Sequence, residues 1–201
     1  MVHNDAAVTL KDARARYFEV NRFGESGGYD DAWVDFHLGP IAAPFPNTAG
    51  RRRAVRYHDL HHVLTGYRTD IRGEAEISAW ELGSGCFDMK AAWFLNLGGF
   101  WLGALIAPRL TWRAYTRGLR SRNLYALAFD DALLGRTVGE VRREVGLDDA
   151  GPGAPEDGGD VAGFVGTALL AELVALATTP LLLVFIPIGL LSTLGKRWSA
   201  A

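Results

Sequence analysis

Cysteine is nearly absent from this chain, since Cys86 is the only one among 201 residues. An intrachain disulfide and a two-cysteine zinc or redox motif are therefore excluded, and we expect Cys86 to be a small buried hydrophobe. The first residues, MVHNDAAVTLKDARARYF, contain no apolar run of signal-peptide length. This pattern predicts that the chain is not secreted.

A basic excess is also lacking. Lys and Arg number 21 against 23 Asp and Glu, and the formal net charge is -2. Surfaces that bind nucleic-acid phosphates usually carry a basic excess, so we expect no nucleic-acid partner. Apolar residues at 49% and charged residues at 22% are typical of a folded globular chain of this length.

Strand patterns are scarce, and helical spacing dominates up to residue 147. We therefore predict an all-α domain over residues 1–147. A short helix is expected over residues 10–23 and a longer one over residues 51–64, with Gly66 as its cap. Thr69 or Asp70 is expected to begin the next helix, which runs toward Leu82.

The following apolar stretch, residues 91–108, allows two interpretations: a buried core helix, or a helix whose face meets lipid. Residues 109–147 predict two further amphipathic helices, with breaks at Gly118 and at residues 135–137. Residues 148–160, DDAGPGAPEDGGD, have the composition of a linker.

The last segment, residues 161–201, belongs to a different compositional class. Glu172 is the only charge between Val161 and Gly195, and a membrane span requires ~20 apolar residues. Pro180 and Pro187 leave three interpretations open: a single kinked span, a hairpin in the membrane, or a soluble buried hairpin.

The residues after this segment, Lys196-Arg197-Trp198, are typical of an interfacial anchor on the cytoplasmic side of a membrane. Because the folded domain is also expected in the cytoplasm, both ends of the segment would lie on one side. This favours a membrane hairpin with arms 161–179 and 181–195, or a re-entrant loop.

Three of the five histidines lie within five positions, in YHDLHHVLTGYRTDIRGE, residues 57–74. On a helix His58 and His62 lie ~40° apart on one face, with Asp59 ~60° from His62, and His61 points away from Asp59. Two histidines four residues apart, joined by a carboxylate from elsewhere, are the pattern of a metal site between two helices.

The carboxylate from elsewhere is Glu74, which the turn GYRTDIRG brings back as the next helix begins. Glu81 lies seven residues on, about 20° from Glu74 on the same helix face. It is expected to support the ligands from behind or to ligate directly. The predicted metal ligands are thus His58, His62 and Glu74, with Asp59 as a fourth ligand or general base.

This pattern, HDxxH followed by eleven residues and Glu, resembles the signature of the Coq-four family of ubiquinone (coenzyme Q) biosynthesis proteins. TGYRTDIRGE is similar to the family's short turn ending in Gly-Glu, and Glu81 falls where the family has another Glu. RYFEVNRF, residues 16–23, and residues 121–147 resemble its upstream and closing segments. The chain departs from the family in its shorter N-terminal portion and in its additional C-terminal hydrophobic segment.

The resemblance implies an all-α fold and a divalent metal, usually zinc, held by His58, Asp59, His62 and Glu74. It implies removal of the ring C1 carboxylate of a polyprenylated hydroxybenzoate-type intermediate, with hydroxylation at that carbon, at a membrane. Other quinone-biosynthesis proteins and a second copy of the chain are the further partners expected.

In this hypothesis the metal orients the substrate carboxylate, Asp59 moves a proton at C1, and residues 91–108 hold the first isoprene units. Zinc has no accessible redox couple, so iron(II) is the alternative metal. The principal alternative function is a non-catalytic scaffold that binds polyprenyl lipid and organises other enzymes. A metal-dependent phosphohydrolase fits less well, because only His3 and His37 lie outside the cluster.

Overall fold

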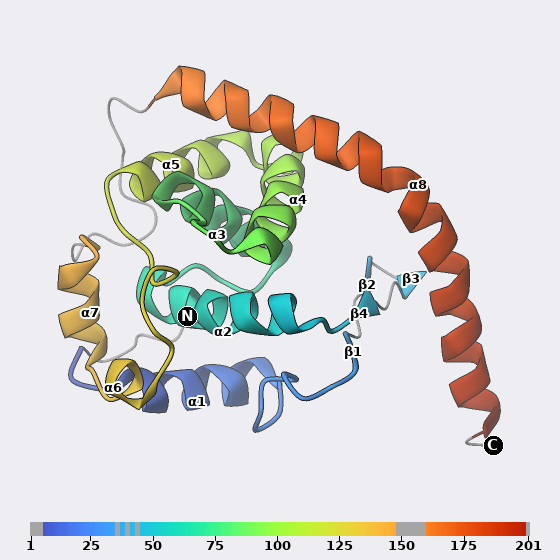
Figure 1. Ribbon diagram of the computed structural model, residues 1–201, viewed down its shortest axis with the longest axis horizontal. Helices are drawn as coiled ribbons and strands as arrows, with labels where there is room; N and C mark the ends of the chain where they lie inside the picture. Colours follow the sequence, from blue (N-terminus) through green and yellow to red (C-terminus); the bar gives the residue numbers. More distant parts are fainter. Residues whose placement is uncertain (1–5, 35–36, 39–40, 43–44, 148–159, 200–201) are drawn as a thin grey trace.

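The computed structural model describes residues 6–34, 37–38, 41–42, 45–147 and 160–199, and over these ranges the chain is mainly helical, as predicted (Figure 1). The helices are α1 (Leu10–Asn21), α2 (Ala49–Thr65), α3 (Ile71–Ser84), α4 (Lys90–Ile106), α5 (Pro108–Leu119), α6 (Asp131–Leu134), α7 (Val138–Glu144) and α8 (Val161–Ser199). Between α1 and α2, β1 (Trp33–Val34) pairs with β4 (Phe45–Pro46) and β2 (His37–Leu38) with β3 (Ile41–Ala42), both antiparallel.

The turn between α2 and α3 is fixed by caps on both sides, as predicted. Gly66 adopts the left-handed conformation with φ of 77°, which lets its N–H bond to the His62 carbonyl and end α2. The Asp70 side chain accepts the Gly73 N–H and begins α3. Because the turn is short and capped, the first turn of α3 lies beside the last turns of α2.

Helix α3 lies at the centre of the domain, packed against α4 and α5 (Figure 1). A Cβ on Gly83 of α3 would lie 2.3 Å from the Tyr115 carbonyl oxygen of α5, and one on Gly118 would lie 2.3 Å from the Trp80 carbonyl oxygen. The predicted helix break at Gly118 is confirmed to within one residue, since α5 ends at Leu119 with Arg120 as its cap. Gly118 is the penultimate residue of α5, where the lack of a Cβ allows the backbones of α3 and α5 to approach closely.

The remaining helical predictions are refined by the structure. In place of two helices over residues 109–147 there is one long helix, α5, followed by the short α6 and α7. Helix α4 buries Leu97 and Phe100 and exposes Phe94 and Leu105, so residues 91–108 have one core face. Contact of the exposed face with lipid stays a prediction. The core around these helices includes the fully buried Leu60, Leu64, Ile77, Trp80 and Leu124.

Helix α8 runs as one continuous helix through Pro180 and Pro187, so the predicted hairpin is wrong. A proline removes one N–H donor and bends a helix, but the chain on either side can remain helical. Residues Val161–Leu181 are long and apolar enough to cross a membrane by length and composition. The predicted linker falls almost wholly on residues 148–159, which lie outside the described residues.

Candidate metal centre

Three of the four predicted metal ligands meet at the junction of α2 and α3. The Nε2 atoms of His58 and His62 lie 3.2 Å apart, and each lies 3.3 Å from an oxygen of Glu74. His58 and His62 share a face of α2 because they are four residues apart. Glu74 joins them because the Asp70 cap places it in the first turn of α3.

These separations match those of ligands around one small cation. Zinc binds imidazole nitrogen and carboxylate oxygen at ~2.0–2.2 Å, and two such ligands of a tetrahedron are then about 3.3 Å apart. The spacing among His58, His62 and Glu74 is 3.2–3.3 Å. One ligand atom from each of the three side chains lies within 4.8 Å of the others, so the group could hold a divalent cation.

Hydrogen bonds at the Nδ1 atoms, on the side away from Glu74, fix the orientation of both imidazole rings. Nδ1 of His58 lies 2.9 Å from the Glu81 carboxylate, and Nδ1 of His62 lies 3.0 Å from the Tyr67 carbonyl. An ionised carboxylate and a carbonyl can only accept, so each Nδ1 carries the hydrogen. In the neutral rings both Nε2 lone pairs then face the Glu74 carboxylate, an arrangement that a cation or a proton must neutralise.

The titration behaviour of the cluster agrees with this need for positive charge. Burial alone would lower the pKa of His58, but Glu81 and Glu74 outweigh it and raise that pKa well above its usual range. Burial alone would raise the pKa of Glu74, but His62 and His58 hold it well below its usual range. A proton on the Nε2 of His58 thus occupies the position that a metal would take.

Asp59, the fourth predicted ligand, lies outside this trio. The atoms that form the ligand group are contributed by His58, His62 and Glu74. The Asp59 carboxylate instead accepts a hydrogen bond from the Tyr29 hydroxyl. Burial raises the pKa of Asp59, and the Tyr29 hydrogen bond and nearby histidines only partly offset this effect. A buried carboxyl with a raised pKa next to a metal site is suited to proton transfer.

Glu81 lies directly behind the predicted ligands, as expected of a supporting residue. Its fully buried carboxylate contacts the Nδ1 atoms of His58 and His61 at 2.9 and 2.7 Å. It also accepts hydrogen bonds from Tyr125 at 2.6 Å and Asn96 at 2.5 Å. Burial alone would raise the pKa of Glu81, but His58 and His61 hold it well below its usual range.

His61, Asn96 and Tyr125 are the parts of this network that the sequence analysis missed. His61 is fully buried and bridges Glu81 to the Leu124 backbone N–H, which its Nε2 accepts at 3.0 Å. The signal for His61 was present, because residues three apart on a helix share a face and His61 follows His58 by three. Nothing in the local pattern pointed to Asn96 or Tyr125.

Solvent reaches the cluster through His58 and Glu74 and hardly through His62. The side chain of His62 is 1% exposed, whereas those of His58 and Glu74 are 20% and 45% exposed. The Tyr17 ring stacks on His62 with centroids 5.6 Å apart and covers its outer face. Three candidate ligands, two of them with partly exposed side chains, resemble catalytic metal sites, which keep a position open for water or substrate.

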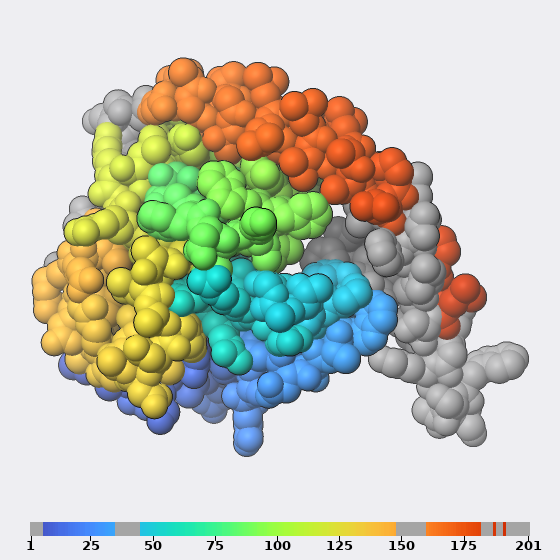
Figure 2. Space-filling view, viewed as in Figure 1, coloured from blue at the N-terminus to red at the C-terminus, as the bar shows by residue number. Residues whose placement is uncertain are grey.

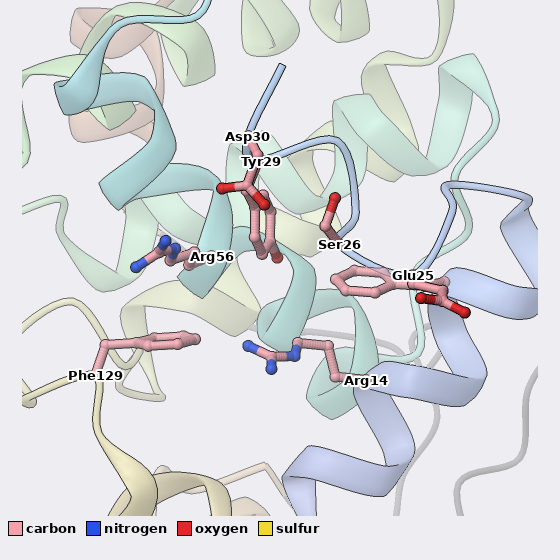
Figure 3. A pocket seen from close by; sticks show the side chains of 8 residues that line it. Arg14, Glu25, Ser26, Tyr29, Asp30, Arg56 and Phe129 are labelled. Carbon is pink, nitrogen blue, oxygen red and sulfur yellow. The ribbon is translucent and has the colours of Figure 1, made fainter. Parts of the chain in front are cut away.

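A cavity of about 230 Å³ adjoins the site on the side of Tyr29. Figure 3 shows the side chains of Arg14 from α1 and Arg56 from α2 approaching Phe129. Their guanidinium carbons lie 5.5 and 6.0 Å from the centre of that ring. Phe18, Glu25, Ser26 and Asp30 complete the lining. Tyr29 forms one wall and also reaches Asp59, so it links this cavity to the metal cluster.

Comparisons of the chain with family models, with curated proteins and with solved structures give no match.

Proposed function

We propose that this protein is a metal-dependent enzyme of ubiquinone biosynthesis, of the Coq-four type, acting on a polyprenylated hydroxybenzoate-type acid. The observation that carries the proposal is the meeting of His58, His62 and Glu74 at 3.2–3.3 Å with both Nε2 atoms directed at the carboxylate. Zinc is the first candidate metal, with iron(II) as the alternative.

The reaction proposed is removal of the ring carboxylate at C1. A bound divalent cation would supply charge neutralisation and orientation for that carboxylate. As carbon dioxide leaves, the electron pair of the broken bond remains on C1 and takes a proton from Asp59. The raised pKa of Asp59 supports this role, since a carboxyl must hold its proton in order to donate it.

Replacement of the carboxylate by a hydroxyl group is in addition a two-electron oxidation. It requires an external oxidant, such as dioxygen, and a metal that exchanges electrons. Two histidines and one carboxylate suit iron(II) for this purpose, whereas zinc has no accessible redox couple. The metal bound therefore decides whether C1 ends with hydrogen or with a hydroxyl group.

Helix α4 is the proposed support for the first isoprene units. It borders the site, because Asn96 of α4 donates to Glu81, and one turn earlier it exposes Trp93, Phe94 and Leu95. The apolar helix α8 supports a place at a membrane, where a polyprenyl substrate dissolves, and the proposed side is the cytoplasmic one. Other quinone-biosynthesis proteins and a second copy of the chain remain the proposed partners.

The test begins with elemental analysis of purified protein, wild type beside His62→Ala and beside His37→Ala as a histidine control. We expect near-stoichiometric zinc or iron in wild type and in His37→Ala, and none in His62→Ala. Carbon dioxide release from a polyprenyl hydroxybenzoate is then measured on zinc-loaded and iron-loaded protein, beside Asp59→Asn. Metal-free wild type that folds normally would contradict the proposal.

The alternative is a non-catalytic scaffold that binds polyprenyl lipid and organises other enzymes, and the long exposed apolar surface of α8 favours it. The two functions are separated by a folded His62→Ala variant in cells that depend on this chain for quinone synthesis. A scaffold would sustain synthesis in this variant, whereas an enzyme would not.

A further inference from the structure

Helix α8 is apolar on two sides, and only one of them is covered by the rest of the domain. The covered face contains Phe164, Ala168 and Ala171, spaced at helical intervals. Phe164 lies between the rings of Phe100 and Trp112, with centroids 5.0 and 5.1 Å away, and Ala171 is 1% exposed. The first half of α8 is therefore docked on α4 and α5.

Glu172, the one charged residue between Val161 and Gly195, takes part in the contact between α8 and α4. Glu172 accepts a hydrogen bond of 2.6 Å from the indole N–H of Trp101 on α4. Removing this carboxylate from its partner into hydrocarbon would be costly. The contact therefore favours a state in which α8 stays against α4 and does not stand alone across a bilayer.

A second side of the same helix is an uncovered aliphatic stripe. Val161, Leu169, Leu173 and Leu176 are each 61–64% exposed, and Val165 is about half exposed. Figure 2 shows this part of α8 lying along the outside of the domain, over α4 and α5. Such a continuous apolar stripe on a surface marks a contact with a protein or with lipid.

The composition of the stripe favours lipid. Protein interfaces are enriched in Tyr, Trp and Arg, and a coiled-coil seam is flanked by charged residues. The large apolar residues of the stripe are all Val or Leu, and Glu172, which is exposed beside them, is bonded to Trp101. After Glu172 the sequence has no charge until Lys196 and Arg197. Basic residues and a tryptophan at the end of an apolar helix are typical of the boundary between lipid headgroups and hydrocarbon.

We propose that α8 lies in the plane of a lipid surface, with the Val161–Leu176 stripe in the acyl region, while it remains docked on α4. The domain takes the place of the polar face that an isolated interfacial helix requires. In this state the helix does not cross the bilayer. The inference rests on the proposed membrane association and is independent of the metal chemistry.

The first test compares binding of the full chain to vesicles of phosphatidylcholine and phosphatidylglycerol with that of Leu169→Glu/Leu173→Glu. We expect the partition coefficient to fall on the order of a hundredfold, because burial of each leucine contributes roughly tenfold or more. The matched control, Val20→Glu/Leu127→Glu, changes two exposed residues away from α8 and should bind as wild type. Unchanged binding of the first variant would overturn the proposal.

The second test separates lying in the plane from spanning. A short bis-maleimide that joins the two cysteines of Trp101→Cys/Glu172→Cys locks α8 onto α4. We expect the locked protein to bind vesicles as the same variant does before cross-linking. Loss of binding on locking would mean that α8 must leave α4 to insert, and would overturn the proposal.

Two further measurements complete the design. Sedimentation of wild type without vesicles tests whether a second copy covers the stripe, and a stable dimer that ignores vesicles would overturn the proposal. Metal content is measured on every variant. The stripe lies away from the cluster, so the two proposals can fail separately. A variant that loses vesicle binding but keeps its metal tests the role of α8 alone. A variant that loses its metal but keeps vesicle binding tests only the proposed enzyme.

Discussion

His58 and His62 direct their Nε2 atoms toward each other across 3.2 Å, and hydrogen bonds at the opposite ring nitrogens hold both rings in this orientation. Two neutral imidazoles with this tautomer present lone pair to lone pair, so the pair is stable only with positive charge between them. The geometry of this candidate metal site is thus set by Glu81 and the Tyr67 carbonyl as much as by His58 and His62 themselves.

Metal binding should therefore release protons near neutral pH. The raised pKa of His58 means that its Nε2 is protonated at a pH where an ordinary histidine is neutral, and a metal must displace that proton. The release should shrink as pH rises above the pKa of His58. Calorimetric titration with zinc in buffers of different ionisation heats measures it, and heats independent of the buffer would contradict the expectation.

Replacement of Glu81 by glutamine should weaken both the fold and the site. The substitution removes the negative charge that accepts the Nδ1 hydrogens of His58 and His61. It also places a buried amide N–H₂ group, which is a donor, among side chains that donate to Glu81. We expect a loss of roughly 3–5 kcal/mol in the free energy of unfolding. Metal affinity should fall about 10–100-fold.

Urea denaturation and metal titration measure these two effects of Glu81→Gln. The matched control is Glu76→Gln, on the same helix, whose carboxylate contacts neither histidine in the described structure. Equal effects of the two variants would show that Glu81 has no special part in orienting the ligands.

Replacement of Tyr29 by phenylalanine should change proton transfer and leave metal content unchanged. The Tyr29 hydrogen bond lowers the pKa of Asp59, so its loss should raise that pKa further. Asp59 would then keep its proton to higher pH, and the alkaline limb of the pH–activity profile should move to higher pH. A pH profile of carbon dioxide release beside metal analysis measures this, and an unmoved limb would separate Asp59 from the proton step.

Local spacing was enough to predict that His58, His62 and Glu74 come together, because the two histidines share one helix face and the capped turn returns Glu74 to them. It did not predict Asn96 and Tyr125, which reach Glu81 from later segments through tertiary packing. For α8, composition indicated an apolar segment. Two prolines suggested a hairpin, but the structure keeps one continuous helix.

Cys86 should be inert in the folded protein. Burial, with a further contribution from Glu81, raises the pKa of its thiol to about 12, and the side chain is fully buried. The thiolate that reacts with disulfide reagents is therefore scarce and inaccessible at neutral pH. Reaction with a chromogenic disulfide should be undetectable in buffer and complete in urea. Rapid native labelling would contradict this burial and would complicate cross-linking through introduced cysteines.

The crossing of α3 and α5 offers the sharpest test of the fold, because the chain contains its own control. Alanine at Gly83 adds a Cβ that would lie 2.3 Å from the Tyr115 carbonyl oxygen, so the helices must separate. We expect a loss of ~1–3 kcal/mol or more in the free energy of unfolding. Metal affinity should fall as well, since α3 carries Glu74 and Glu81.

The matched control is Gly98→Ala. Gly98 lies inside α4, and a Cβ there meets no atom within 4 Å. That substitution should stabilise the protein by roughly 0.5–1 kcal/mol, because alanine favours a helix over glycine. Urea denaturation of the two variants should give shifts of opposite sign. Shifts of the same sign would mean that α3 and α5 do not approach through Gly83, and the placement of Glu74 and Glu81 beside α2 would lose its structural basis.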